Sequence, residues 1–360
     1  GVKIMRSNSF AAIAASFHLF NSLCAASAVT FSLLGQFPQP APSSFVVVGS
    51  NLPDGRFVLW NGDEVFVQDF ANSAALQVVA SGYEGDPGFL LVAPDGHTAY
   101  LGAGFRTELY TLDLNAPVDF VSGTELTVPE HYAGEFLSPD LLVLDRFKND
   151  FSAAELVVVD VSAKKSAPIV RSVLTLPGPP TKQQVLEKPA GSFSALLKAD
   201  PTGTLLYVMD ANTRELRTFA IADLINAFNT STSLDWTADG TAFGAPGDYF
   251  SGGVSGFRPN GDLVIGGSEG FAQPGGIQIV DATLETVIET LDPQGDQSFY
   301  SVIYNPVTDA IIATTGLSVT YATEGAFSAV PVPTPAAAPW VLGCAALALC
   351  AVALVRVARA

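Results

Sequence analysis

Residues 89–113 read FLLVAPDGHTAYLGAGFRTELYTLD, and this stretch decides the fold. Two runs rich in aliphatic and aromatic side chains flank the tetrapeptide APDG at 93–96. Proline there fixes φ at the first turn position, and aspartate followed by glycine suits the tight corner that comes next. A third run ends at Asp113. The stretch therefore predicts three adjacent antiparallel strands, of which the first two form a short hairpin.

The same turn recurs six times, each time between two hydrophobic runs. The copies are LPDG at 52–55, APDG at 93–96, SPD at 138–140, DPTG at 200–203, RPNG at 258–261 and NPVTD at 305–309. Successive copies leave room for four short strands each, which is the pattern of a β-propeller blade. We therefore expect an all-β protein with six blades. Seven blades are the alternative, if residues 29–34 pair with the segment after Leu317 to close the ring.

The rest of each repeat agrees with four-stranded blades. A third run often ends in aspartate, as at Asp113, Asp160 and Asp281, and a fourth run follows at 286–291. Helical periodicity is nearly absent, and the best candidate is 220–228, which we expect to be an insertion in the long fourth repeat.

These turns and third strands resemble those of the YVTN/NHL-like and lactonase-like propellers, whose blades carry S-P-D-G turns and V-x-D third strands. The resemblance covers about residues 45–323. It implies the propeller fold and leaves the activity open, because such propellers carry many functions.

The N-terminal region has the pattern of a secretory signal peptide, counted from Met5. Arg6 supplies a positive charge, residues 10–23 are mostly apolar, and Ala26-Ser27-Ala28 forms an A-x-A cleavage site. We therefore expect the mature chain to begin at Val29.

The C-terminal region has three parts: a proline-rich spacer, an uncharged apolar segment at 340–355, and the basic residues Arg356 and Arg359. The apolar segment is somewhat shorter than the roughly 20 residues of a relaxed membrane span. The two arginines suit the cytoplasmic side of a membrane. We expect a transmembrane helix here.

This C-terminal end resembles the PEP-CTERM sorting signal of Gram-negative bacteria, which an exosortase recognises. The motif stands at Val332-Pro333-Thr334-Pro335-Ala336, with Thr334 in place of the usual glutamate. The resemblance implies surface display or release in bacteria that produce exopolysaccharide. A plain C-terminal membrane anchor is the alternative. The predicted segments are the signal-peptide region at 1–28, the propeller at 29–328, the spacer with the sorting motif at 329–339, and the hydrophobic helix with its basic tip at 340–360.

Composition narrows the range of partners. The chain has 17 basic and 35 acidic residues, a formal net charge of −18, and this repels nucleic acid phosphates. Its three cysteines, Cys24, Cys344 and Cys350, all lie in the terminal segments. The propeller region therefore has no disulfide framework and no cysteine-ligated zinc site, and its stability depends on its core.

Acidic residues fall in loops that we expect to converge at one mouth of the central channel. The candidates are Asp86, Glu135, Asp145, Asp210, Asp248 and Asp296. A ring of carboxylates suits a hard cation such as Ca²⁺, and Asp86, Asp145, Asp210 and Asp296 are the predicted metal ligands. The alternative is that aspartate is used here as a turn former. No calcium-loop motif accompanies these residues.

The sequence predicts no catalytic residues. His131, next to Tyr132, is the one histidine that is neither in the signal peptide nor in a predicted turn, and we expect it in a solvated loop. No G-x-S-x-G motif or P-loop is present. We expect a non-catalytic binding or scaffold protein at the cell envelope, associated with an exosortase-like protease, the membrane, and an extracellular polymer or surface protein. The alternative is an exported metal-dependent hydrolase of lactonase or esterase type that uses the channel-mouth carboxylates.

Overall fold

The structure is a computed structural model that describes residues 31–36, 48–69, 75–83, 87–104, 106–116, 125–147, 154–162, 168–176, 197–210, 213–250, 252–268, 275–291, 299–315 and 319–323. These residues form six four-stranded antiparallel sheets. Five sheets each contain four strands that are consecutive in the chain, and the sixth joins the first strand of the chain to the last three. The predicted all-β propeller is confirmed.

We call the sheets blades 1 to 6 and give their strands from the channel outward. Blade 1 contains β2 (Val48–Asn51), β3 (Phe57–Trp60), β4 (Val65–Asp69) and β5 (Ala75–Ala80). Blade 2 contains β6 (Pro87–Val92), β7 (Thr98–Ala103), β8 (Arg106–Asp113) and β9 (Glu125–His131). Blade 3 contains β10 (Ala133–Ser138), β11 (Leu141–Phe147), β12 (Ala154–Asp160) and β13 (Val170–Thr175).

The second half of the chain continues the pattern. Blade 4 contains β14 (Leu197–Ala199), β15 (Leu205–Asp210), β16 (Glu215–Ala220) and β17 (Thr241–Phe243). Blade 5 contains β18 (Val254–Phe257), β19 (Leu263–Ser268), β20 (Gly275–Asp281) and β21 (Thr286–Leu291). Blade 6 contains β22 (Phe299–Asn305), β23 (Ala310–Thr315), β24 (Val319–Thr323) and β1 (Phe31–Gln36).

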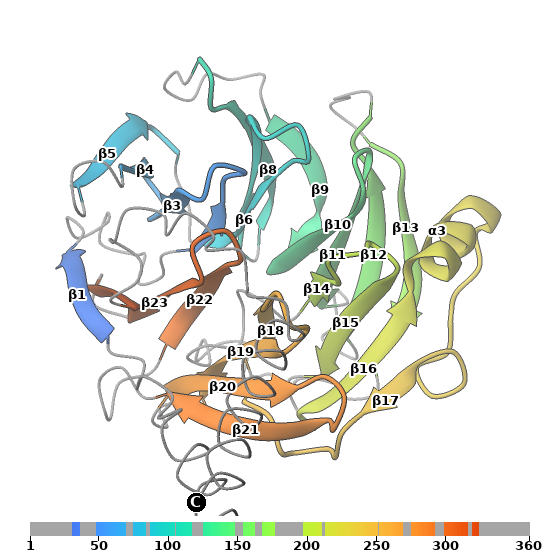
Figure 1. Cartoon of the computed structure of the whole chain (residues 1–360). Helices are drawn as coiled ribbons and strands as arrows, with labels where there is room; N and C mark the ends of the chain where they lie inside the picture. The colour runs from blue at the N-terminus through green and yellow to red at the C-terminus, as the bar shows by residue number, and fades with distance from the viewer. Residues whose placement is uncertain are drawn as a thin grey trace, which may run out of the picture.

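The blades are arranged in a closed ring around a central channel (Figure 1). Each innermost strand contacts the innermost strand of the next blade, and β22 contacts β2 to complete the circle. β1 pairs with β24, so the two ends of the propeller meet at the rim of blade 6. A seventh blade would require β1 and β24 to form a sheet of their own. Instead, these two strands complete the sheet that β22 and β23 begin. Closure in this way removes free sheet edges between the first and last parts of the chain.

The six predicted turns all join an innermost strand to the second strand of the same blade. At Gly55 and Gly96 φ is +87° and +76°, and each glycine N–H donates to the carbonyl three residues earlier. Glycine adopts this left-handed conformation without the steric cost that a Cβ would bring. The repeated turn therefore fixes where each inner hairpin reverses.

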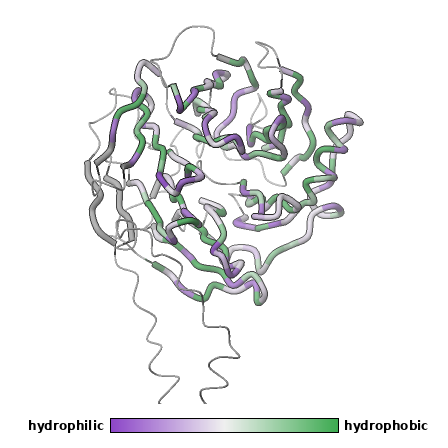
Figure 2. Tube along the Cα trace, turned by 45° about the horizontal axis from the view of Figure 1, so that its top comes forward, coloured by the Kyte–Doolittle hydropathy of each residue, from purple (hydrophilic) through white to green (hydrophobic). Residues whose placement is uncertain are grey.

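The core lies between the blades, as alternation along the strands requires. Along β11, Leu142 and Leu144 pack against blade 2, whereas Val143 faces the cluster shared with blade 4. Successive side chains of a strand point to opposite faces of its sheet, so a blade between two neighbours buries both faces. Figure 2 shows the outcome, with hydrophobic stretches on the strands and hydrophilic residues interspersed among them.

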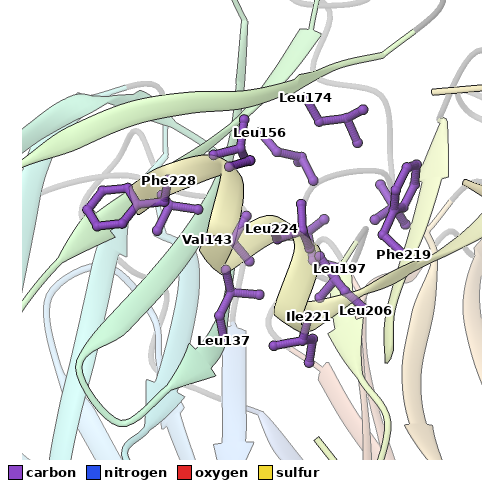
Figure 3. Close-up of a cluster of buried hydrophobic side chains, with 14 of the residues drawn as sticks. Leu137, Val143, Leu156, Leu174, Leu197, Leu206, Phe219, Ile221, Leu224 and Phe228 are labelled. Carbon is purple, nitrogen blue, oxygen red and sulfur yellow. The ribbon is translucent and has the colours of Figure 1, made fainter. Parts of the chain in front are cut away.

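One helix, α3 (Ile221–Thr230), interrupts blade 4 between β16 and β17 and covers the outside of the ring. The insertion predicted at 220–228 is confirmed. Leu224 and Phe228 of the helix enter the cluster shared by blades 3 and 4 (Figure 3). Arg171 of β13 donates to the carbonyl oxygen of Phe228 and lies over the phenyl ring, 5.1 Å from its centroid. The helix therefore attaches the outer strand of blade 3 to blade 4.

The predicted signal peptide at 1–28, the spacer at 329–339 and the hydrophobic helix at 340–360 lie outside the described residues. Within the described part of the chain, no helix has the length and apolar character that crossing a bilayer requires.

Candidate functional site

A small cavity of about 50 Å³ lies in the central channel of the ring, and all six innermost strands contribute to its wall. Its polar side chains come from five different blades and include Ser50, Glu135, Lys198, Ser255 and Ser301. The hydroxyl oxygen of Ser255 is buried and has no hydrogen-bond partner among the described residues. The wall of the channel thus offers polar groups to a guest or to water.

An ion pair crosses from blade 3 to blade 4 at this wall. The Nζ atom of Lys198 on β14 lies 2.7 Å from Oε2 of Glu135 on β10. The Glu135 side chain is 8% exposed, and the Lys198 side chain is 34% exposed. The other oxygen of Glu135 accepts a hydrogen bond from the backbone N–H of Phe136. The pair links two adjacent innermost strands and fixes one charged group of each sign at the channel.

Asp145 lies at the end of β11, opposite Ala133 on β10. Alternation places its side chain on the same face as Val143, which packs against blade 4. The residue is fully buried, and neither carboxylate oxygen meets hydrogen-bond geometry with a described residue. Burial of a carboxylate is costly even with the Tyr132 hydroxyl nearby, so this position favours a bound proton or a compensating charge.

Asp210 faces Asp145 from the other side of the same interface. It ends β15 on the face of Leu206 and Val208, which pack against blade 3, and it is 2% exposed. One of its oxygens accepts a hydrogen bond of 2.9 Å from the backbone N–H of Thr213. The fold therefore brings together two acidic residues that are 65 positions apart in the sequence.

The environment favours the neutral form of Asp145. Burial raises the pKa of this carboxyl group to about 8, and the charge of Asp210 adds to the increase. The Tyr132 hydroxyl acts in the opposite direction, because it lies close enough to stabilise the carboxylate. Burial also raises the pKa of the Tyr132 phenol well above its usual value, and the charges of Asp145 and Asp210 contribute to this. Tyr132 is therefore the third member of the group, although its residue type and position in the sequence did not single it out.

The predicted ligands divide into two sets. Asp145 and Asp210 come together, as the convergence argument requires, although they lie inside the interface of blades 3 and 4 rather than in open solvent. Asp86 and Asp296 lie outside the described residues. Within the described ranges, no group of three or more histidine, cysteine, aspartate or glutamate side chains is placed to hold a metal ion. Asp248 is exposed before β18.

The prediction of a solvated loop for His131 is wrong. The residue ends β9 and is 1% exposed, with its ring 5.4 Å from that of Phe89. Its Nδ1 lies 2.8 Å from the carbonyl oxygen of Pro129. A Cβ at Gly102 would overlap with both rings, so glycine is required there. Burial lowers the pKa of His131 to about 4 and keeps the imidazole neutral. The ring fills a pocket between blades 2 and 3 and is not accessible to a dissolved substrate.

No protein-family model matches this chain, and no curated protein matches it. Among solved structures, it is similar to the β-propeller domain of Cps50 (Swd1) from Myceliophteria thermophila, with a TM-score of 0.50 and 11% sequence identity. The similarity covers 81% of this chain and 98% of that one. At this identity the likeness shows the fold alone, and the class that fold and site define is a β-propeller with a polar central channel.

Proposed function

We propose that this protein is an exported β-propeller held at the cell surface, where it binds an extracellular polymer or another surface protein and does not catalyse a reaction. A propeller is well suited to this role because its closed ring presents a rigid surface built from many separate loops. The acidic composition, with a formal net charge of −18, favours partners other than nucleic acids and anionic surfaces.

The observation that carries the proposal is where the ring begins and ends. β1 is the outermost strand of blade 6, and β24 is its neighbour, so both ends of the propeller lie at the rim. The chain segment that would anchor the protein follows Thr323, at the end of β24. This point lies far from the channel and from the six innermost strands that surround it. Attachment at the rim therefore leaves the channel and its surrounding loops free for a ligand.

The two terminal segments carry the signals for the proposed localisation at the cell surface. The A-x-A site at Ala26-Ser27-Ala28 precedes β1 by two residues, so cleavage there would leave the closing strand intact. The sorting motif Val332-Pro333-Thr334-Pro335-Ala336 begins nine residues after the end of β24. An exosortase-like protease would therefore cut outside the propeller, and the released or transferred product would retain all six sheets.

The burial of Asp145 and Asp210 favours binding over a metal-dependent hydrolase. A catalytic carboxylate must reach the substrate, its bound metal or the attacking water during the reaction. Asp145 is 0% exposed and Asp210 is 2% exposed, and both lie inside the interface between two blades. Their position suits a structural role.

Deletion of residues 331–360 tests the proposed localisation. We expect the full chain to be associated with the cell envelope and the deletion variant to be freely secreted, as measured by fractionation and immunoblotting. A matched variant keeps the hydrophobic segment but carries Pro333→Ala and Pro335→Ala in the sorting motif. It distinguishes processing by an exosortase from plain anchoring by the hydrophobic segment. We expect this variant to remain in the membrane without being cleaved. Recovery of the deletion variant in the envelope fraction would contradict the anchor.

Binding is tested with the secreted deletion variant and exopolysaccharide extracted from the producing bacterium. We expect the propeller to co-sediment with the polymer, and Lys198→Gln to weaken this if the ligand enters the channel. Asp54→Asn, in an exposed turn, serves as the control. An absence of binding to both polymer and intact cell surface would contradict the proposal.

A further inference from the structure

The cavity at the centre of the ring limits the size of a guest. Its volume is about 50 Å³, and a water molecule requires about 10–15 Å³. The cavity therefore holds about three to five waters, or a guest group with a similar number of non-hydrogen atoms. A whole sugar ring is larger than this limit, whereas the exocyclic hydroxymethyl group of a sugar, or a two-carbon diol, is within it.

The charges at the cavity wall favour a neutral guest. Lys198 and Glu135 both line the cavity, and in their 2.7 Å ion pair one charge cancels the other. An anionic guest would compete with Glu135 for the ammonium group, and a cationic guest would compete with Lys198 for the carboxylate. Either competition is costly, because it separates a pair in which the Glu135 side chain is only 8% exposed. A neutral polar guest avoids this cost.

The uncharged polar side chains of the wall suit hydroxyl groups. Ser50, Ser255 and Ser301 contribute to the wall from blades 1, 5 and 6. A serine hydroxyl both donates and accepts hydrogen bonds, and a lysine ammonium has three N–H groups, of which the ion pair with Glu135 uses one. Solvent reaches this wall, since the Lys198 side chain is 34% exposed. A guest hydroxyl also donates and accepts, so it matches both kinds of group.

We propose that the cavity binds a short, neutral, hydroxyl-bearing group of the extracellular polymer, such as the exocyclic hydroxymethyl group of a sugar unit. This inference rests on the binding function proposed above and names the part of the polymer that the channel recognises. The guest group displaces water from the cavity and retains affinity because its hydroxyl reproduces the hydrogen bonds of the water. A free two-carbon diol has the same chemistry, so the experiment distinguishes the two sources.

The first measurement uses ethylene glycol as the probe, because it has two hydroxyl groups and few other atoms. Saturation-transfer NMR detects its binding to the full chain, purified in a detergent without hydroxyl groups. We expect a saturable signal for the wild type and for Asp54→Asn, which changes a turn side chain that is 53% exposed. Ser50→Val places methyl groups at the cavity wall and should reduce the signal several-fold. Lys198→Met removes the N–H donors and should also reduce it, so it remains informative if Ser50→Val does not fold.

The second measurement is co-sedimentation of the same proteins with the extracted exopolysaccharide. Excess ethylene glycol and Ser50→Val should each weaken polymer binding several-fold. Polymer binding that neither of them changes would assign the cavity to a free diol and overturn its link to the polymer.

Failure of the cavity site and failure of the proposed function are distinguishable. The inference is overturned, and the proposed function stands, if the wild type binds the polymer but gives no saturable signal with ethylene glycol. It is also overturned if Ser50→Val and Lys198→Met both give the signal of the wild type. A wild type that binds ethylene glycol but neither polymer nor intact cell surface would contradict the proposed function, and with it the polymer as the source of the guest.

Discussion

Two neighbouring interfaces of the ring solve the same packing problem in different ways. Between blades 4 and 5, aromatic side chains fill the space: the ring of Tyr207 lies 5.7 Å from that of Phe243 and 5.1 Å from that of Phe257. Between blades 3 and 4, the apolar cluster gives way to the buried acids Asp145 and Asp210 and to the pair of Glu135 with Lys198. Both interfaces join the same kinds of strand, so the difference lies in side-chain chemistry.

The comparison distinguishes residues that stabilise an interface from residues that make it selective. Aromatic burial provides non-directional stabilisation that depends on area and fit. Buried charges provide little or no net stability, and they restrict which partner, ion or register the interface accepts. We therefore expect changes at the interface of blades 4 and 5 to affect stability alone. Changes at the interface of blades 3 and 4 should also alter how stability depends on pH, because burial raises the pKa of Asp145 to about 8.

The largest expected effect comes from the aromatic interface. Phe243→Ala should lower the free energy of unfolding by about 3–5 kcal/mol, because it removes a buried phenyl ring and leaves a cavity. Phe243→Leu should cost less than about 1.5 kcal/mol, since it retains most of the volume. Chemical denaturation measures both. A loss below about 1 kcal/mol for the alanine variant would show that the interface rearranges to fill the space.

His131 extends the comparison to the interface of blades 2 and 3, where a polar residue is buried neutral. Its pKa of about 4 in the folded chain is below the unfolded value of about 6.5, so the unfolded chain binds more protons between these limits. Its contribution to stability is fully present above pH 6.5 and is lost as the pH falls through 4. The loss is about 3 kcal/mol at most.

His131→Phe checks this assignment. It should flatten the decline in stability between pH 6.5 and 4 relative to the wild type, as measured by urea denaturation at each pH. His97→Phe is the control, because the His97 side chain, in the turn region before β7, is 43% exposed. Equal pH dependence in the wild type and in His131→Phe would show that the buried imidazole does not contribute to acid unfolding.

The smallest expected effect concerns the ion pair at the channel. Lys198→Met leaves Glu135 nearly buried without its partner, which costs about 1–2 kcal/mol after allowance for the partial exposure of the lysine side chain. Adding Glu135→Gln should recover most of this loss. Denaturation of the wild type, the two single variants and the double variant gives the coupling energy. A double variant no more stable than Lys198→Met would show that the two charges are not coupled.

Local chemistry made much of the fold predictable. Each proline-containing turn was placed correctly between the first two strands of a blade, because proline and glycine restrict the backbone wherever they occur. The third strands end at Asp113, Asp160 and Asp281 as predicted, and the fourth strand at 286–291 has the predicted bounds. The helix insertion was also visible, since its periodicity differs from that of the strands.

The candidate site was less accessible to sequence reasoning. Asp145 and Asp210 were selected as loop acids, and the structure places them at buried strand ends on faces that meet. Tyr132 was noticed only as a neighbour of His131, and His131 was predicted to be solvated. The burial of a polar residue depends on what the neighbouring blade presents to it, and a single sequence does not show this contact.

By itself, the sequence determined the repeat and the strand order within each blade, and it predicted the two terminal signals that motivate the proposed localisation. These follow from interactions between residues close in the chain, such as turn geometry, alternation and hydrophobic runs. The tertiary structure decided that β1 closes blade 6, that His131 is buried, and that two acids 65 residues apart face each other. Those outcomes depend on which faces of separate sheets come together when the ring closes, and no local pattern encodes that contact.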